Sequence, residues 1–326
     1  MLTKPKIKMT TIVMAMALLI GPIKSFAQDS VTLRAVLGWP ESNDLVIPFF
    51  VFKDLIEERS NGRVQIRLLG GPESVPAFEQ AEAIRNGIVD IAMSTSSYYA
   101  AAMPEAYAMD FSELTAEEER ANGSYDYLVE LHRERLNVHY LGRTPGRQYA
   151  FYTIDEVRHT RDFAGKNIRA TAVYSSLLEA LGATFTNIPG TETYTALERR
   201  VVDGVSWPNV GVTGLGFNDH VRYQITPYFW QTGTGIIMSA RVWDNLSDDL
   251  KNIFNEVMVE VEARSVEIMA EIIEEETKRL VESGVEIVVL EDAENFTATA
   301  NKAAWEWFAQ RAPQRAAEME PMFRKQ

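Results

Sequence analysis

Strand and helix patterns alternate through the first two thirds of this chain, and this alternation limits the possible folds more than any other feature. Short apolar runs at 31–37 and 63–69 flank an amphipathic pattern at 45–58, and a third apolar run covers 88–93. A β-α-β-α-β order of this kind requires a largely parallel sheet covered by helices. A second unit of the same type covers 148–206. The sequence therefore predicts an α/β fold.

The N-terminal residues are typical of a secretory signal peptide. Three lysines among the first eight residues precede an apolar run at 9–20, and Ser25-Phe26-Ala27 provides small residues for cleavage before Gln28. The run is short for a membrane span, so an uncleaved anchor is the weaker alternative. We expect residues 1–27 to be removed and the mature protein to reach the periplasm.

Charge and cysteine content exclude several classes of partner. The chain of 326 residues has a formal net charge of −14 and no cysteine. Phosphate contacts need clustered Lys and Arg, so we expect no nucleic-acid partner. Without cysteine, neither a disulfide framework nor a lipoprotein anchor can form. A local positive site could still bind a small anion. The mature length suits two lobes better than one core.

A long amphipathic pattern extends from Ser247 to Gly284. No Pro or Gly interrupts it, and its apolar residues recur at helical spacing. A helix of this length spans roughly 50 Å, which is enough to cross two lobes. A last helix carries Trp305, Trp307 and Phe308, which we expect to be packing residues.

Motifs for catalysis are not found in the sequence. The four histidines have no pair at convincing metal-ligand spacing. The segment 204–208 has a Ser between Gly and Pro, but it lacks the second Gly of a nucleophile elbow. We therefore expect no catalytic residues, no metal site and no cofactor, and we interpret the chain as a binding protein rather than an enzyme.

Candidate binding residues lie where strands are expected to end. In open α/β sheets, ligands bind beyond the carboxyl ends of the strands. An Arg in such a place can offer a planar fork of donors to one oxyanion, and the alternative is a surface Arg. Ordinary packing is the alternative for the aromatic residues. The candidates at these strand ends are Trp39, Tyr98, Tyr99, Arg147, Arg169 and Trp207.

Several segments together resemble a known family. Gly165-Lys166-Asn167-Ile168-Arg169 is followed by Leu181-Gly182-Ala183, then by Tyr194-Thr195-Ala196-Leu197 and Val202-Asp203-Gly204. Gly71-Pro72-Glu73 and Trp243-Asp244-Asn245-Leu246 also match in order and spacing. With the long helix, this arrangement is similar to the DctP-type extracytoplasmic solute receptors of TRAP transporters. The resemblance covers nearly the whole mature chain.

The resemblance implies a two-lobed periplasmic binding protein fold with a long lobe-spanning helix. It places lobe one at 28–144 plus 235–272 and lobe two at 145–234 plus 273–326. A receptor of this kind captures a small organic anion between its lobes. It delivers the solute to the small and large membrane subunits of an ion-driven permease, without ATP. A receptor that reports ligand occupancy to a membrane sensor is an alternative, and a periplasmic enzyme is a weaker one.

The same resemblance assigns roles to single residues. The Arg at the place of Arg169 pairs bidentately with the ligand carboxylate, and Arg147 lies near the place of a second ligand-contacting Arg. Trp207 stands where many relatives have Asn, which favours a compact ligand or one with an apolar face, and a sulfonate could replace the carboxylate. Glu73 and Tyr194, which lie in matching segments, complete the set of candidate ligand-binding residues.

Overall fold

The computed structural model of the chain describes residues 30–325. The predicted signal peptide, residues 1–27, lies outside this range. None of the helices within residues 30–325 is both long and apolar enough to cross a membrane.

Lobe one is built on a five-stranded sheet in the order β2-β1-β3-β10-β4. Strand β1 is parallel to both β2 and β3, as the alternating sequence pattern predicts. Strand β10 comes from much later in the chain and lies antiparallel between β3 and β4. The strands of this sheet are β1 (Val31–Leu37), β2 (Val64–Leu68), β3 (Ile91–Thr95), β4 (Val138–Arg143) and β10 (Thr234–Ser239).

Lobe two is built on a six-stranded sheet in the order β11-β9-β5-β8-β6-β7. Strand β6 is parallel to β7 and β8, whereas β5 is antiparallel to β8 and β9. The strands of this sheet are β5 (Gln148–Thr153), β6 (Asn167–Arg169), β7 (Thr184–Thr186), β8 (Gly204–Pro208), β9 (Tyr223–Gln231) and β11 (Glu286–Val289).

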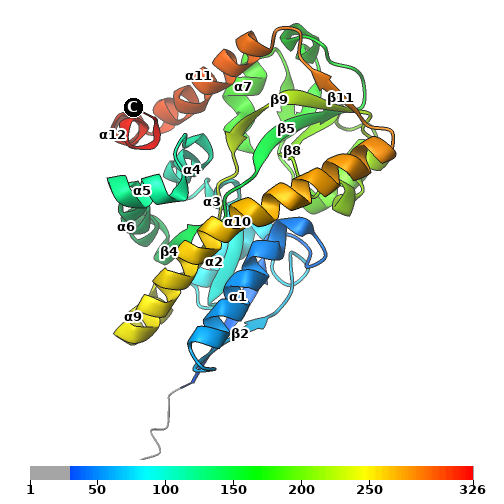
Figure 1. Cartoon of the computed structure of the whole chain (residues 1–326). Helices are drawn as coiled ribbons and strands as arrows, with labels where there is room; N and C mark the ends of the chain where they lie inside the picture. The colour runs from blue at the N-terminus through cyan, green and yellow to red at the C-terminus, as the bar shows by residue number, and fades with distance from the viewer. Residues whose placement is uncertain (1–29, 326) are drawn as a thin grey trace, which may run out of the picture.

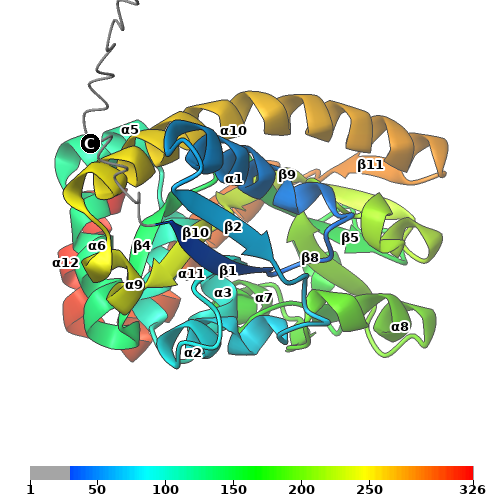
Figure 2. The same ribbon diagram turned by 90° about the horizontal axis from the view of Figure 1, so that it is seen from below.

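Helices cover the faces of both sheets (Figures 1 and 2). Their bounds are α1 (Ile47–Arg59), α2 (Gln80–Arg85), α3 (Ser96–Tyr99), α4 (Ala108–Phe111), α5 (Ala116–Asn122), α6 (Ser124–Leu136), α7 (Ser175–Ala180), α8 (Thr193–Glu198), α9 (Ala240–Asn245), α10 (Asp248–Glu282), α11 (Ala293–Arg311) and α12 (Pro313–Phe323).

The predicted long helix is α10, which has 35 residues. Ser247 occupies its N-cap position, although its side chain makes no capping hydrogen bond. Gly284, with φ of +90°, lies two residues beyond the helix end, where a left-handed residue stops a helix. Helix α10 packs against α1 and α5 of lobe one and against β11 of lobe two. Figure 1 shows it crossing both lobes, so the prediction of an α/β fold with a lobe-spanning helix is confirmed.

Two predicted elements differ from the structure. The apolar run at 88–93 becomes a strand only from Ile91, because the carboxylate of Asp90 accepts hydrogen bonds from the backbone and side chain of Arg34. Charged residues are frequent at 117–135, a pattern that predicts one surface helix, but the segment forms α5 and α6. Gly123, with φ of +88°, separates the two helices.

The C-terminal helices contact both halves of the molecule. Helix α11 packs on α7 and β9, while α12 packs on α4, α5 and α6. Trp305, Trp307 and Phe308 are buried, as expected for packing residues. The residue boundaries of the two lobes stay a prediction.

Phe254 should be the side chain through which α10 contributes most to the stability of lobe one. It is fully buried, and its ring lies 6.0 Å from that of Phe52 and 6.2 Å from that of Trp243. We expect Phe254→Ala to lower the free energy of unfolding by about 3–5 kcal/mol, because it leaves a cavity. Urea denaturation measures this change. Val259→Ala is the control, since Val259 lies on the same helix but is 49% exposed, and its effect should stay within about 0.5 kcal/mol.

Candidate functional site

A small cavity lies between the two lobes, at the carboxyl ends of strands from both sheets. Residues after β1 and β3 line it from lobe one, and residues at the ends of β6 and β8 line it from lobe two. The space open to the centre of a water molecule is only about 20 Å³. The lining residues are Trp39, Thr95, Ser97, Tyr98, Tyr149, Arg169, Thr171, Tyr174, Ser206, Trp207, Pro208 and Thr234.

Arg169 is the only charged residue among the described residues that line this cavity. It is the last residue of β6, as predicted, and only 3% of its surface is exposed. Its Nε and Nη2 atoms donate to the carbonyl oxygen of Ile188, at 3.0 and 2.6 Å. Burial lowers the pKa of the guanidinium, and nearby tyrosines, foremost Tyr98, oppose this shift. A buried cation is therefore held in place by a backbone carbonyl, while the cavity lining contains no carboxylate.

Trp207 packs beside this guanidinium. The Cζ atom of Arg169 lies 5.1 Å from the centre of the Trp207 ring, within the range of a cation–π contact. The ring also packs edge-on against Phe217 and lies against Gly190, where a Cβ atom would come within 2.5 Å of the indole. Gly190 therefore makes room for the indole, which shields one side of Arg169 from water.

Trp39 and Tyr98 form the lobe-one side of the cavity. Their rings lie 5.8 Å apart, and both residues are buried. Tyr98 comes from α3, directly after β3, and approaches Arg169 across the cleft between the lobes. Burial raises the pKa of Tyr98, and the charge of Arg169 opposes this increase. The structure thus brings together four of the predicted residues: Arg169, Trp207, Trp39 and Tyr98.

Many polar atoms of the lining have no hydrogen-bond partner within the described part of the chain. Buried polar groups in proteins are normally paired, so a concentration of unpaired ones requires an explanation. The atoms are Trp39 Nε1, Thr95 Oγ1, Ser97 Oγ, Thr171 Oγ1, Tyr174 OH, Ser206 Oγ and Trp207 Nε1. They surround the same small space as Arg169, which is the arrangement expected of a site that hydrogen-bonds a polar ligand.

Sequence reasoning missed several of these residues. Thr171 lies two residues after the end of β6 and Ser206 two residues before the end of β8, so the rule that predicted Arg169 and Trp207 could also have found them. Tyr149 lies within β5, and its sequence position carries no comparable signal.

Three predicted site residues lie away from the cavity. Tyr99 points into the core of lobe one, where its hydroxyl lies 3.0 Å from Nε2 of His132. Glu73 is exposed and accepts a hydrogen bond from the backbone of Gly71. Tyr194 is 36% exposed and packs against His220. None of the three lines the cavity around Arg169.

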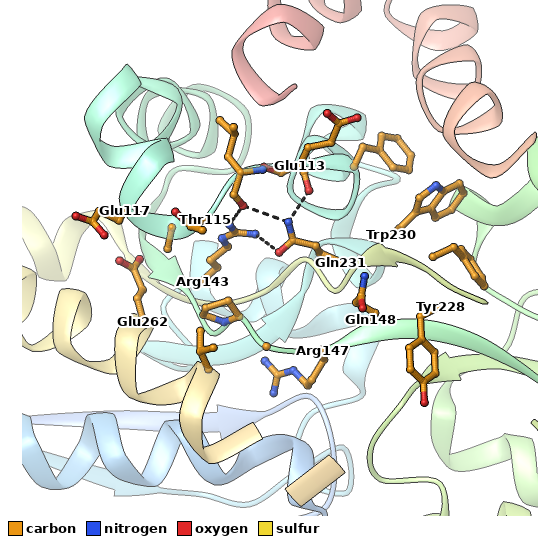
Figure 3. Close-up of a pocket in the computed structure, with 18 of the residues that line it drawn as sticks. Glu113, Thr115, Glu117, Arg143, Arg147, Gln148, Tyr228, Trp230, Gln231 and Glu262 are labelled. Carbon is orange, nitrogen blue, oxygen red and sulfur yellow. Dashed lines mark hydrogen bonds between the residues drawn. The ribbon is translucent and has the colours of Figure 1, made fainter. Parts of the chain in front are cut away.

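Arg147 lies in a different and larger pocket, of about 890 Å³, on the strands that join the two lobes. Figure 3 shows its side chain apart from Arg143 and Gln231, which are hydrogen-bonded to each other. Its Nη1 donates to the carbonyl of Leu45 at 3.2 Å, and its Nη2 donates to the backbone and hydroxyl of Thr144. Burial lowers its pKa to about 10. Arg147 thus lies apart from the cavity around Arg169, with its Nη donors on backbone segments and its Nε unpaired within residues 30–325, and its role as a second ligand arginine stays a prediction.

The turn that follows Trp39 is held from lobe two and from α10. Nδ2 of Asn43 donates to the carbonyl of Gly211 at 3.2 Å, and Arg279 pairs with Asp44 at 2.8 Å. Gly211 lies four residues after Trp207, and Asn43 lies four residues after Trp39. The two segments that carry the indoles of the site therefore meet again in a direct contact between the lobes.

Asp110 occupies a buried position where the chain crosses between the lobes. Its carboxylate accepts hydrogen bonds from the backbone of Gly233 at 3.1 Å, from Tyr149 at 3.3 Å and from the hydroxyl of Ser96. Burial raises its pKa from 3.8 to about 7, and these donors only partly oppose the shift. Since Tyr149 lines the cavity, Asp110 connects the crossing strand to one wall of the site.

We expect Gly211→Ala to weaken ligand binding by opposing lobe closure. Gly211 has φ of +82°, and an added Cβ would lie 2.7 Å from Oδ1 of Asn43. Gly165→Ala is the matched control, because Gly165 has φ of +79° but no atom within 4 Å of its added Cβ. Gly211→Ala should lose at least about fivefold more affinity than this control, about 1 kcal/mol. Equal affinities of the two variants by calorimetry would contradict the role of the contact.

Asp110 should make the folded protein less stable as the pH rises from about 4 to about 7. In this window the folded state keeps a proton that the unfolded state, with a pKa of 3.8, has released. The stability from this group is therefore complete below about pH 4, falls by up to about 1.4 kcal/mol per pH unit, and levels off above about pH 7. Urea unfolding across this range should show a smaller decline for Asp110→Asn. An identical decline in both proteins would refute the assignment.

Known proteins of similar sequence and structure are solute-binding proteins. The monocarboxylate 2-oxoacid-binding periplasmic protein of Nostoc sp. strain PCC 7120 is 24% identical over 314 residues, which cover 91% of this chain and 85% of the relative. A TRAP transporter solute-binding protein of Bordetella bronchiseptica RB50, with calcium and picolinate bound, has a TM-score of 0.77 at 22% identity. That match covers 90% of this chain and 92% of the other.

A TRAP periplasmic solute-binding protein of Desulfovibrio salexigens with bound orotic acid has a TM-score of 0.79 at 17% identity, covering 90% of this chain and 97% of the other. These structures confirm the two-lobed fold. The family model for DctP, described as bacterial extracellular solute-binding protein, family 7, matches residues 38–311. This match extends over most of the chain, which therefore belongs to the DctP family of bacterial extracellular solute-binding proteins.

Proposed function

We propose that this chain is the periplasmic receptor of a TRAP transporter and that it binds a small organic anion at Arg169. One observation carries the proposal: Arg169 is almost fully buried, and none of the residues from 30–325 that line its cavity carries a carboxylate. A buried charge without a partner is unfavourable. An anion in this cavity would supply that partner and would be bound preferentially over neutral molecules of the same shape.

The names of the relatives support this class of ligand. The Nostoc relative is named for monocarboxylate 2-oxoacids, and the two solved structures hold picolinate and orotic acid. All of these are carboxylic acids or their anions. The proposed binding residues in this chain are Arg169 as the anion partner, with Trp207, Trp39 and Tyr98 as the walls that exclude water.

Lobe closure provides the link to transport. The cavity lies between lobes that contact each other through Asn43 and Gly211, so a ligand must enter and leave when the lobes separate. A closed and an open receptor present different surfaces, and a membrane permease can distinguish them. We propose that the leader at 1–27 directs the chain to the periplasm, and that small and large permease subunits receive the ligand there without ATP.

A ligand of the proposed class should raise the thermal stability of the protein. At a hundredfold excess over its dissociation constant, it should add about 2.7 kcal/mol to the free energy of unfolding. A thermal-shift panel of organic acids, sugar acids, sulfonates and amino-acid derivatives measures this effect. The absence of a shift with any acid would count against the proposal.

Arg169→Lys should lose at least about tenfold in affinity for the best acid of the panel, although the charge is retained. The planar guanidinium donates to Ile188 and still has donors for a carboxylate, whereas an ammonium group cannot reproduce this fork. Arg161→Lys is the control, since the Arg161 side chain is 78% exposed. Calorimetry on both variants, each first shown to be folded, provides the test. Unchanged affinity in Arg169→Lys would overturn the role of Arg169.

A further inference from the structure

We infer that the ligand of this cavity is a compact monocarboxylate with no ammonium group, no second carboxylate and at least one further hydrogen-bond acceptor. This inference rests on the proposed function, because it assumes that the cavity around Arg169 is the ligand site. It goes beyond that function by defining which organic acids the residues of this chain can and cannot accommodate.

The charges of the lining set the first limit. Arg169 contributes one positive charge, and the other eleven lining residues are uncharged aromatic, hydroxyl-bearing or proline residues. A second carboxylate on the ligand would be buried without a cation, and an ammonium group would be buried without an anion. Either arrangement is costly in a closed site. The lining therefore matches a ligand with a single negative charge.

Asp110 does not change the conclusion that the ligand carries a single negative charge and no ammonium group. Its buried carboxylate acts on Tyr149 and Tyr174 of the lining, but it does not line the cavity itself. Its oxygens already accept hydrogen bonds from Ser96, Tyr149 and Gly233. The Tyr149 side chain, which does line the cavity, binds Asp110 through its hydroxyl. An ammonium group in the cavity would therefore meet the tyrosine rather than the carboxylate.

The hydrogen bonds of Arg169 define how the carboxylate is bound. A guanidinium has five N–H donors, and the Nε–H and one Nη2–H of Arg169 point to the Ile188 carbonyl. The remaining donors are the two of Nη1 and the second one of Nη2. These lie at the end of the guanidinium, where a carboxylate can accept two parallel hydrogen bonds. The carbonyl of Ile188 thereby leaves the Nη1–Nη2 edge for a carboxylate, which would share this edge with the hydroxyl of Tyr98.

The neutral donors of the lining point to a second acceptor on the ligand. Nε1 of Trp39 and Nε1 of Trp207 can only donate, and neither has a partner within residues 30–325. Hydroxyl groups on the same lining can donate as well. A ligand whose remainder is purely aliphatic would leave both indole N–H groups buried and unpaired. An oxo or hydroxyl oxygen near the carboxylate would satisfy at least one of them.

The size and walls of the cavity set the last limit. About 20 Å³ is open to the centres of water molecules, compared with about 10–15 Å³ for a site that holds one water. The indoles and tyrosine rings provide flat surfaces on both lobes. The closed cavity thus holds little more than one water molecule, and any ligand must move its walls apart. A short or planar molecule requires the smallest movement, whereas an extended sugar acid would keep the lobes apart.

The test compares matched ligands by isothermal calorimetry on the intact mature chain. Short 2-oxo monocarboxylates are measured beside their α-amino, dicarboxylate and carboxamide analogues of equal length, with a sulfonate analogue included. We expect the 2-oxo monocarboxylate to bind at least about tenfold more tightly than each of the other four analogues. Equal or tighter binding of the amino acid, the dicarboxylate or the sulfonate would overturn the inference while leaving the proposed function intact.

Other outcomes would contradict the proposed function instead. One such outcome is that the carboxamide binds as tightly as the acid. The other is that the protein binds none of the acids.

A variant provides a second test that does not depend on folding defects. Trp207→Phe keeps a ring beside Arg169 but removes the indole N–H. We expect its affinity for the 2-oxo acid to fall by about two- to tenfold, the effect of one neutral hydrogen bond. Its affinity for the simple aliphatic carboxylate of the same length should fall less, because that ligand has no second acceptor for the indole N–H. An equal loss for both ligands would contradict the assignment of a second acceptor.

Discussion

The buried charge of Arg169 is the constraint around which the rest of the site is arranged. Strand β6 ends at this residue, and the segment after β7 supplies the carbonyl of Ile188 that orients its guanidinium. Gly190, two residues later, lets the Trp207 ring lie against the same segment. Each neighbour fixes or shields the cation, and none neutralises it. The fold therefore buries a positive charge away from water, and a bound anion would neutralise it.

Arg147 shows that burial alone does not define such a site. Both arginines are almost fully buried and neither has a carboxylate among the groups that act on its pKa. The difference lies in the hydrogen-bond partners. Arg147 spreads its donors over Leu45, Thr144 and Met269, and so ties together segments near the crossing between the lobes. Arg169 gives two donors to one carbonyl and turns its other edge toward the cavity and Tyr98. The first arrangement is structural and the second is suited to a ligand.

The sequence predicted the parts of the fold that depend on local pattern. The strand at 31–37, the end of β6 at Arg169 and the extent of α10 follow from apolar periodicity and from stop signals. The cavity was predicted only where it follows the strand-end rule, as for Trp39, Arg169 and Trp207. Tyr98 and Tyr99 were equivalent in the sequence, yet one lines the cavity and the other contacts His132. Which face of a short helix meets the cleft is decided by tertiary packing. Such packing also decided the places of Arg147, Glu73 and Tyr194.

The contact between Asn43 and Gly211 has a kinetic consequence. A molecule enclosed between Trp39 and Trp207 can leave only after this contact and the neighbouring pair of Asp44 and Arg279 have separated. The dissociation rate then depends on how often the lobes separate as well as on the contacts between the protein and the ligand. The apparent affinity also includes the fraction of molecules that are in the binding-competent state. The residence time of the ligand therefore also depends on the two segments that carry Trp39 and Trp207. A transporter that separates these segments would control when the ligand is released.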